Sequence, residues 1–309
     1  MNPQSALEAA GPQAARIASL WWFMFWVFAA VFVIVIGTML WALMRRGGPA
    51  DERKMTRVVG AATGLTVAIL LLMLVASVST GRAVSRLGPK ERGMTVEVTG
   101  NQWWWDVRYA NDDASRIVVT ANEIHVPVGR PVMIRGSSRD VIHSFWPPNL
   151  NGKIDFIPSR ITTQWFVANQ PGRFRGQCAE FCGLQHAHMA LWIVAEPPDV
   201  FEAWMQRQLQ PAPEPATPAA SRGRDVFLQN PCVMCHSISG TDAAGRVAPD
   251  LTHVGSRLTI AAGTLPNTRE NLRRWIRDPH AIKPGNHMPT IALADADLDS
   301  VVDYLETLR

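Results

Sequence analysis

The chain has 309 residues, of which 47% are hydrophobic and 18% are charged, and its formal net charge is +4 at pH 7. This length suggests about two to three domains. The positive charges are spread along the chain without a long Lys/Arg run, which argues against a nucleic-acid-binding arm.

Two long apolar segments lie near the N-terminus, at 20–44 and 58–81, and neither contains a charged residue. About 20 residues suffice to cross the hydrocarbon core, so both segments predict membrane spans. A cleaved signal peptide is the alternative for the first segment, but its apolar core would be only about 7–15 residues long. Arg45 and Arg46 also follow where a cleavage site needs small residues. Residues 1–90 therefore predict a two-helix transmembrane hairpin.

The charges beside the spans predict their orientation. Only Arg16 precedes the first span, whereas the connecting loop carries five basic residues: Arg45, Arg46, Arg53, Lys54 and Arg57. Because basic loops remain in the cytoplasm, both chain ends are expected on the outer side of the membrane.

Residues 91–209 have the pattern of a β domain. Met94, Val96 and Val98 alternate with polar residues, which is typical of a half-buried strand. Further short strands are expected at 117–120, 131–134, 163–168 and 191–195, separated by Gly, Pro and Asn. This spacing favours a sandwich or barrel. Pro197 and Pro198 then begin a short amphipathic helix.

The last third of the chain has a helical pattern. Residues 210–220 form a Pro/Ala linker, which should be extended and semi-rigid. Within 221–309, a helix that carries Leu272 and Ile276 is expected to end at Pro279. A C-terminal amphipathic helix follows, with Asp295 or Asp297 as its N-cap.

The four cysteines form two close pairs, which two disulfides could explain. The second pair, however, lies in Cys232-Val-Met-Cys235-His236, the C-x-x-C-H spacing of covalent c-type haem attachment. Both thiols can bond the haem vinyl groups, and the histidine can reach the iron. A thioredoxin-like redox pair is the alternative, but it requires a βαβ context that this segment lacks.

An electron-carrying haem needs a second axial ligand, and a thioether raises its potential. Met288 is the only methionine after Cys235, and it precedes Pro289 on a proline-rich loop. The alternatives are His253, His280 and His287, and His287 is the strongest of them because it neighbours Met288. The stretch resembles class I cytochromes c, in which a methionine before proline is the distal ligand; this resemblance favours Met288.

The first cysteine pair belongs to a dense cluster of metal-binding residues. Residues 178–189 contain two cysteines, two histidines, a methionine and a glutamate. Thiolate with imidazole suits copper or zinc, but a weak thioether ligand is typical of copper electron-transfer sites. Two cysteines that bridge two coppers would use both thiolates.

The pattern C-x-E-x-C-x-x-x-H-x-x-M resembles the binuclear CuA signature of cytochrome c oxidase subunit II. The family's upstream histidine motif is similar to Asp140-Val-Ile-His143-Ser144, and its aromatic cluster to Gln102-Trp-Trp-Trp105. The likeness covers about the first 210 residues. With the appended cytochrome, the chain resembles the fused subunit II of caa-type bacterial oxidases.

This resemblance implies a role for each residue of the cluster. Cys178 and Cys182 would bridge two copper ions, and His143 and His186 would each bind one. Met189 would be an axial ligand of one copper, and the carbonyl of Glu180 a ligand of the other.

The resemblance also assigns two residues beside the copper ligands. The Glu180 side chain would face a magnesium ion shared with subunit I, and electrons would enter beside Trp103. Ordinary core packing is the alternative for the other tryptophans of that cluster. His188 has no assigned role, and His125 is expected to be structural or on the surface.

The implied architecture is a transmembrane hairpin, an all-β cupredoxin-like CuA domain and an all-α cytochrome c domain. The implied function is electron delivery from haem c through CuA to subunit I, where oxygen is reduced with proton translocation. Subunits I and III and a c-type cytochrome or other periplasmic donor would be partners, and both soluble domains would be periplasmic. The second span lacks the family's acidic residue at its start, which leaves a proton-uptake role in doubt.

Three other functions remain open from the sequence. A quinol oxidase subunit II has the same fold but lacks the copper ligands that this chain carries. A membrane-tethered copper-binding protein would not need a haem. Electron delivery to a nitric oxide reductase is poorly distinguished from delivery to an oxygen reductase.

Overall fold

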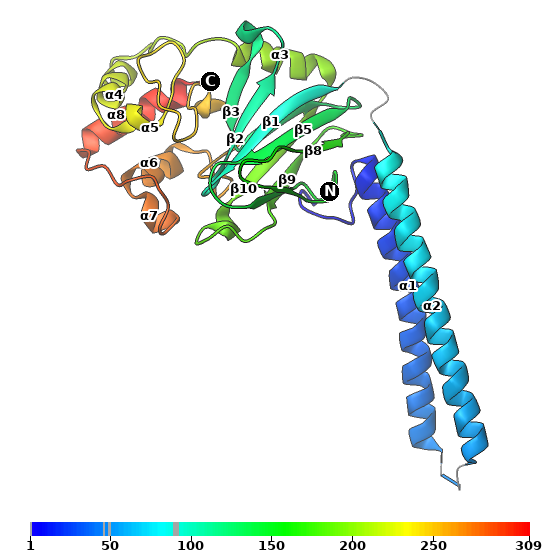
Figure 1. Cartoon of the computed structure of the whole chain (residues 1–309). Helices are drawn as coiled ribbons and strands as arrows, with labels where there is room; N and C mark the ends of the chain where they lie inside the picture. Colours follow the sequence, from blue (N-terminus) through cyan, green and yellow to red (C-terminus); the bar gives the residue numbers. More distant parts are fainter. Residues whose placement is uncertain (1, 46, 49–50, 89–92) are drawn as a thin grey trace. The chain divides into compact units, whose positions relative to one another are not determined.

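The computed structural model describes residues 2–45, 47–48, 51–88 and 93–309 (Figure 1). The chain divides into two compact units, one of residues 13–88 and one that combines the N-terminal segment with the region after 88. Arg46 of the predicted cytoplasmic loop lies outside the described residues, as does the predicted boundary between residues 90 and 91.

Helices α1 (Pro12–Met44) and α2 (Glu52–Arg86) form the first unit. Both are long and apolar enough to cross a membrane, with mean hydropathies of 2.6 and 2.5 over their most apolar windows. Each extends beyond its predicted span because the polar flanking residues continue the helix. Asp51 caps the start of α2 by accepting hydrogen bonds from the backbone amides of Arg53 and Lys54.

Residues 2–11 pack against the β domain before α1 begins. The Ala10 amide donates to the Asn149 carbonyl at 2.7 Å, and the Asn169 amide donates to the Ala10 carbonyl at 2.8 Å. A Cβ on Gly11 would lie 2.7 Å from two backbone oxygens, so only glycine fits there. Ala10 itself is buried in the core of the β domain.

The β domain is a sandwich of two five-stranded sheets (Figure 1). In order, the first sheet contains β3 (Val118–Ala121), β2 (Trp104–Ala110), β1 (Met94–Asn101), β5 (Val132–Ser138) and β8 (Thr162–Phe166). The second contains β4 (Glu123–Pro127), β10 (Ala190–Glu196), β9 (Gly172–Cys178), β6 (His143–Trp146) and β7 (Ile154–Phe156). Strand pairs β1/β5 and β4/β10 are parallel, and the other neighbours are antiparallel.

The interior of the sandwich is aromatic. Trp105 is fully buried, with Phe145 and Phe156 at its edge. The predicted alternation of Met94, Val96 and Val98 is present in β1, where both valines are fully buried. Helix α3 (Pro198–Gln208) closes one end of the domain with Phe201 and Trp204. Short 3₁₀ turns lie at Ala114–Arg116 (η1), His186–His188 (η2) and Val254–Ser256 (η3).

The C-terminal domain consists of short helices around its own core. They are α4 (Pro218–Gln229), α5 (Cys232–Cys235), α6 (Arg269–Arg277), α7 (Pro279–Ile282) and α8 (Asp295–Thr307). The strands β11 (Thr259–Ile260) and β12 (Leu265–Pro266) form a small hairpin. Helix α4 crosses α8 at Gly223, where a Cβ would overlap the Ser300 carbonyl.

Two details of this domain differ from the sequence prediction. Helix α4 begins at Pro218, inside the predicted linker, because the Thr217 hydroxyl caps it by accepting from the Ala220 amide. The predicted N-cap of the last helix is wrong. Ala294 occupies that position, and Asp295 lies in the first turn, where it pairs with Arg273 of α6.

Candidate copper centre and haem site

The sandwich brings all six predicted copper-site residues together at one end. Cys178 is the last residue of β9, Cys182 and His186 follow on the loop, and Met189 precedes β10. His143 begins β6, which pairs with β9, so a distant part of the sequence reaches the same loop. Strands β6, β9 and β10 of the second sheet therefore anchor the site.

Neighbouring donor atoms of this cluster lie within 4 Å of each other. The two thiol sulfurs are 3.7 Å apart. His143 Nδ1 lies 3.8 Å from the Cys178 sulfur, and His186 Nδ1 lies 3.6 Å from the Cys182 sulfur. Met189 Sδ is 3.9 Å from Cys182, and the Glu180 carbonyl is 3.2 Å from Cys178. Two thiols, two imidazoles and a thioether at this spacing fit soft, redox-active copper.

The two cysteines are free thiols that share one hydrogen bond. The hydrogen bond between them lowers the pKa of Cys178, and the same bond, with burial, raises the pKa of Cys182. A cation between the sulfurs would replace the shared proton and favour two thiolates. The site is therefore prepared to lose protons when it binds metal.

Asp140 orients the first imidazole. Its carboxylate lies 2.8 Å from His143 Nε2 and accepts the Gln102 amide at 2.6 Å. Burial alone lowers the pKa of His143, but the hydrogen bonds with Cys178 and Asp140 raise it overall. Since Nε2 is held by the carboxylate, Nδ1 is left free to face the thiols. Such a carboxylate behind an imidazole is typical of metal-binding histidines.

Glu180 and Trp103 both adjoin the cluster. The Glu180 carboxylate is half-exposed and lies 3.6 Å from the Lys153 ammonium. Trp103 donates its indole N–H to the Cys182 carbonyl at 2.9 Å. It is only 7% exposed and lies against His287 of the C-terminal domain, and electron entry beside it remains a prediction.

Trp105, His188 and His125 make structural contacts. Trp105 packs edge-on against His143 and belongs to the core. His188 is held by the Gln185 side chain at 2.8 Å. His125 is buried between Glu123 and Glu196, each at 2.9 Å, and stacks on Trp204.

The haem-attachment motif forms its own turn in the C-terminal domain. Cys232 and Cys235 are free thiols at the two ends of α5, and His236 follows directly. His236 Nδ1 donates to the Pro249 carbonyl at 2.7 Å. This bond fixes the tautomer with an unprotonated Nε2, and burial lowers the pKa of the ring further toward the neutral form. A neutral imidazole beside two thiols fits an iron ligand of a covalent haem.

Met288 lies on the loop between α7 and α8 and is half-buried. Its amide donates to the Asn286 side chain at 2.8 Å, which shapes the loop. Of the three alternatives, His253 is buried and held 3.1 Å from the Gln210 carbonyl, whereas His280 and His287 are exposed. His287 lies against Trp103 with ring centroids 5.2 Å apart. Ligation by Met288 remains a prediction.

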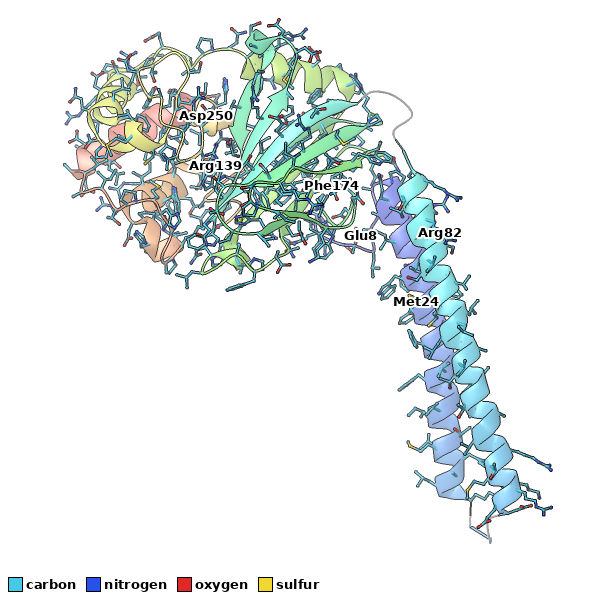
Figure 2. All side chains as sticks on the ribbon, viewed as in Figure 1. Glu8, Met24, Arg82, Arg139, Phe174 and Asp250 are labelled. Carbon is cyan, nitrogen blue, oxygen red and sulfur yellow. The ribbon has the colours of Figure 1, made fainter. Side chains whose placement is uncertain are left out.

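Sequence reasoning missed the residues that join the two domains. Lys283 and Gln185 donate across the boundary, and Glu123 accepts the Leu258 amide at 2.9 Å. Figure 2 labels Arg139 where the β domain meets the C-terminal domain, and its guanidinium donates to the Arg246 carbonyl at 3.1 Å. The one available signal was that Lys283 is the only lysine in the last half of the chain.

Comparison with known families agrees with this division of the chain. Residues 111–196 match the model for the periplasmic domain of cytochrome c oxidase subunit II, and residues 220–309 match the model for cytochrome c. The fold and both sites thus define an electron-transfer protein with a copper-type cupredoxin domain, a cytochrome c domain and two apolar N-terminal helices. The matched cytochrome c domain implies haem c, and the matched oxidase domain implies copper.

Full-length relatives identify the family. Cytochrome c oxidase subunit 2 of Alkalihalophilus pseudofirmus is 34% identical over 99% of this chain and 91% of its own length. The subunit 2 of Bacillus sp. strain PS3 is 33% identical over 80% of this chain and 73% of its own. The chain belongs to the family of cytochrome c oxidase subunit 2.

A solved structure also matches part of the chain. It is the periplasmic domain of subunit II of cytochrome oxidase from Bradyrhizobium japonicum, with 31% sequence identity and a TM-score of 0.35. The match covers 38% of this chain and 94% of that structure.

Proposed function

We propose that electrons reach a terminal respiratory oxidase through this chain, from haem c to a binuclear copper centre and on to the haem of subunit I. There oxygen would be reduced to water with proton translocation. The observation that supports this proposal is the cluster of closely spaced donor atoms around Cys178 and Cys182. The loop that carries Met288 contacts the β domain beside this cluster, through the hydrogen bond from Lys283 to the Trp103 carbonyl.

Each donor has a proposed role. Cys178 and Cys182 would hold the copper ions together with His143 and His186, and Met189 and the Glu180 carbonyl would be weaker ligands. Cys232 and Cys235 would bond the haem, and His236 and Met288 would be its iron ligands. Copper held by two thiolates would supply one-electron transfer with little change in its surroundings. Asp140 keeps His143 in the tautomer whose Nδ1 faces the thiols.

The partners and location follow from the same proposal. The apolar hairpin would cross the bacterial inner membrane beside subunits I and III, with both soluble domains and both chain ends in the periplasm. An external c-type cytochrome or another periplasmic protein would donate electrons. The outward Glu180 carboxylate supports a magnesium site shared with subunit I.

Metal analysis of the full-length chain tests this function. Purified in detergent after expression with copper and haem maturation, the protein should contain two coppers and one covalent haem per chain. Flash reduction of the haem should be followed by reduction of the copper centre. A chain that takes up only zinc, or that oxidises Cys178 and Cys182 to a disulfide under metal-replete conditions, would contradict the proposal.

A further inference from the structure

The Lys283 side chain is buried between the two soluble domains. The residue is only 3% exposed. Its ammonium donates to the carbonyls of Trp103 at 3.0 Å and His188 at 2.9 Å, both in the β domain. The third acceptor, at 3.3 Å, is the Ala261 carbonyl of its own domain. Three donors thus meet three acceptors.

A lysine at this position is costly without a compensating role. Burial disfavours the charged form and lowers the pKa of Lys283 to about 7. Among the described residues, no carboxylate forms a salt bridge with this ammonium. Carbonyl oxygens alone satisfy it, and two of them are available only while the domains are in contact.

The two β-domain carbonyls belong to residues that adjoin the copper site. Trp103 is the residue whose indole donates to the Cys182 carbonyl. His188 directly precedes Met189, the predicted axial ligand. On the other side, Lys283 begins the loop that carries Met288. One ammonium therefore ties the loop of the predicted haem ligand to the loop of the predicted copper ligands.

Neighbouring contacts extend this attachment. The Gln185 side chain donates to the Pro284 carbonyl at 2.7 Å, and the Ala190 amide donates to the Ala262 carbonyl at 2.9 Å. The connection between the domains is also short. Leu209 packs on the β-domain core, whereas the next residue, Gln210, already contacts His253 of the C-terminal domain. The C-terminal domain is thus attached along a continuous surface.

We propose that Lys283 is a positioning residue that locks the haem-bearing loop onto the copper-binding loop. The electron then crosses between docked domains instead of waiting for a tethered domain to find its partner. This inference rests on the proposed function, because it assumes transfer from haem to copper. Beyond that function, it identifies Lys283 as the side chain that sets the distance between the two sites.

The test compares Lys283→Met with the wild-type chain, full length and loaded with both cofactors. The haem is reduced by a light flash, and the rate of copper reduction is followed in buffers of increasing viscosity. The wild-type rate should not depend on viscosity. In Lys283→Met it should fall about tenfold or more and decrease as viscosity rises, because misplaced carriers must first be brought together. Copper and haem spectra should remain unchanged.

Two further variants control this experiment. Arg274→Met removes a positive charge from the exposed face of the same domain, and its rate should equal the wild-type rate. Lys283→Gln keeps a donor without the charge, so its rate should lie between those of wild type and Lys283→Met. It also provides a result if the methionine variant does not fold.

The possible outcomes separate the two proposals. A fast, viscosity-independent rate in both Lys283 variants would overturn the docking role while leaving haem-to-copper transfer intact. A slow rate accompanied by altered haem or copper spectra would show a general structural defect and would also overturn it. If the loaded wild-type chain transferred no electron from haem to copper, the proposed function itself would fail.

Discussion

At the level of single residues, the two predicted cofactor sites can be separated by one substitution each. The Cys178 sulfur lies among the donor atoms of the copper cluster, and Cys232 lies in the haem motif of the other domain. Cys178→Ser should abolish copper binding and retain covalent haem, since a serine oxygen is a poor ligand for copper. Cys232→Ser should impair covalent haem attachment and retain copper binding. Metal analysis and haem staining check both, and a copper-replete Cys178→Ser protein would refute the assignment.

The distal haem ligand is tested by the potential of the haem. Thioether ligation raises the reduction potential, so Met288→Leu should lower it and expose the iron to added imidazole. His287→Ala is the matched variant, because its exposed ring lies one residue away on the same loop. Its potential should stay close to that of wild type. If the alanine variant were the one whose potential fell, the ligand would be His287.

His125 makes the stability of the β domain depend on pH. Burial alone lowers its pKa, but the hydrogen bonds to Glu123 and Glu196 raise it overall. Because its pKa is higher in the folded than in the unfolded chain, His125 contributes fully to the free energy of unfolding below the unfolded pKa of about 6.5. This contribution is lost as the pH rises through the folded pKa.

The matching variant is His125→Gln, with the exposed His280→Gln as control. In thermal melts, His125→Gln should have a lower melting temperature than wild type at low pH. The difference between the two melting temperatures should become smaller as the pH rises. A difference that is constant with pH would show that the imidazole is not charged in the folded domain.

At the level of elements, the crossing of α4 and α8 depends on one missing side chain. Gly223 allows the helices to touch, so Gly223→Ala should destabilise the C-terminal domain by roughly 1–3 kcal/mol through overpacking. Gln229→Ala, at an exposed position of α4, should have little effect. Thermal unfolding followed by the haem absorbance measures both. Equal melting temperatures for both variants would mean that α4 and α8 can move apart to admit the extra methyl group at little cost in stability.

The sequence predicted some elements better than others. The two apolar helices, β1, α3, α6 and α8 were found because each has a long or regular pattern of apolar residues in the sequence. Strands β2, β4, β6, β7 and β9 were not in the predicted set. β4 is buried at every position and therefore shows no alternation, and β7 has only three residues. A signal of period two needs one exposed face and several residues.

The site was predictable to the extent that its ligands were close in sequence. Residues 178–189 form one motif, and His143 joined it only through a family resemblance. The polar contacts between the domains could not be predicted, because Lys283 and its acceptors Trp103 and His188 are distant in sequence. A carbonyl acceptor has no side-chain signature, so nothing in the sequence marks the partner of a buried ammonium.

At the level of the whole molecule, the length of the connection should matter little while the domains stay docked. An insertion of about ten Gly/Ser residues after Leu209 would lower the effective concentration of a freely tethered domain. In the wild-type background we expect an unchanged haem-to-copper rate. The same insertion combined with Lys283→Met should slow the rate further than Lys283→Met alone. A strong effect in the wild-type background would indicate that the linker, and not the contact surface, controls transfer.

The attachment of residues 2–11 to the β domain has a consequence for biosynthesis. Gln4 bonds to Arg175, a partner 171 positions later in the chain. The N-terminal segment can therefore dock onto the β domain only after the ribosome has made both hydrophobic helices and most of the sandwich. Such long-range closure slows folding. We therefore expect that copper would enter at the proposed ligand Cys178, three residues beyond Arg175, at the same late stage of maturation.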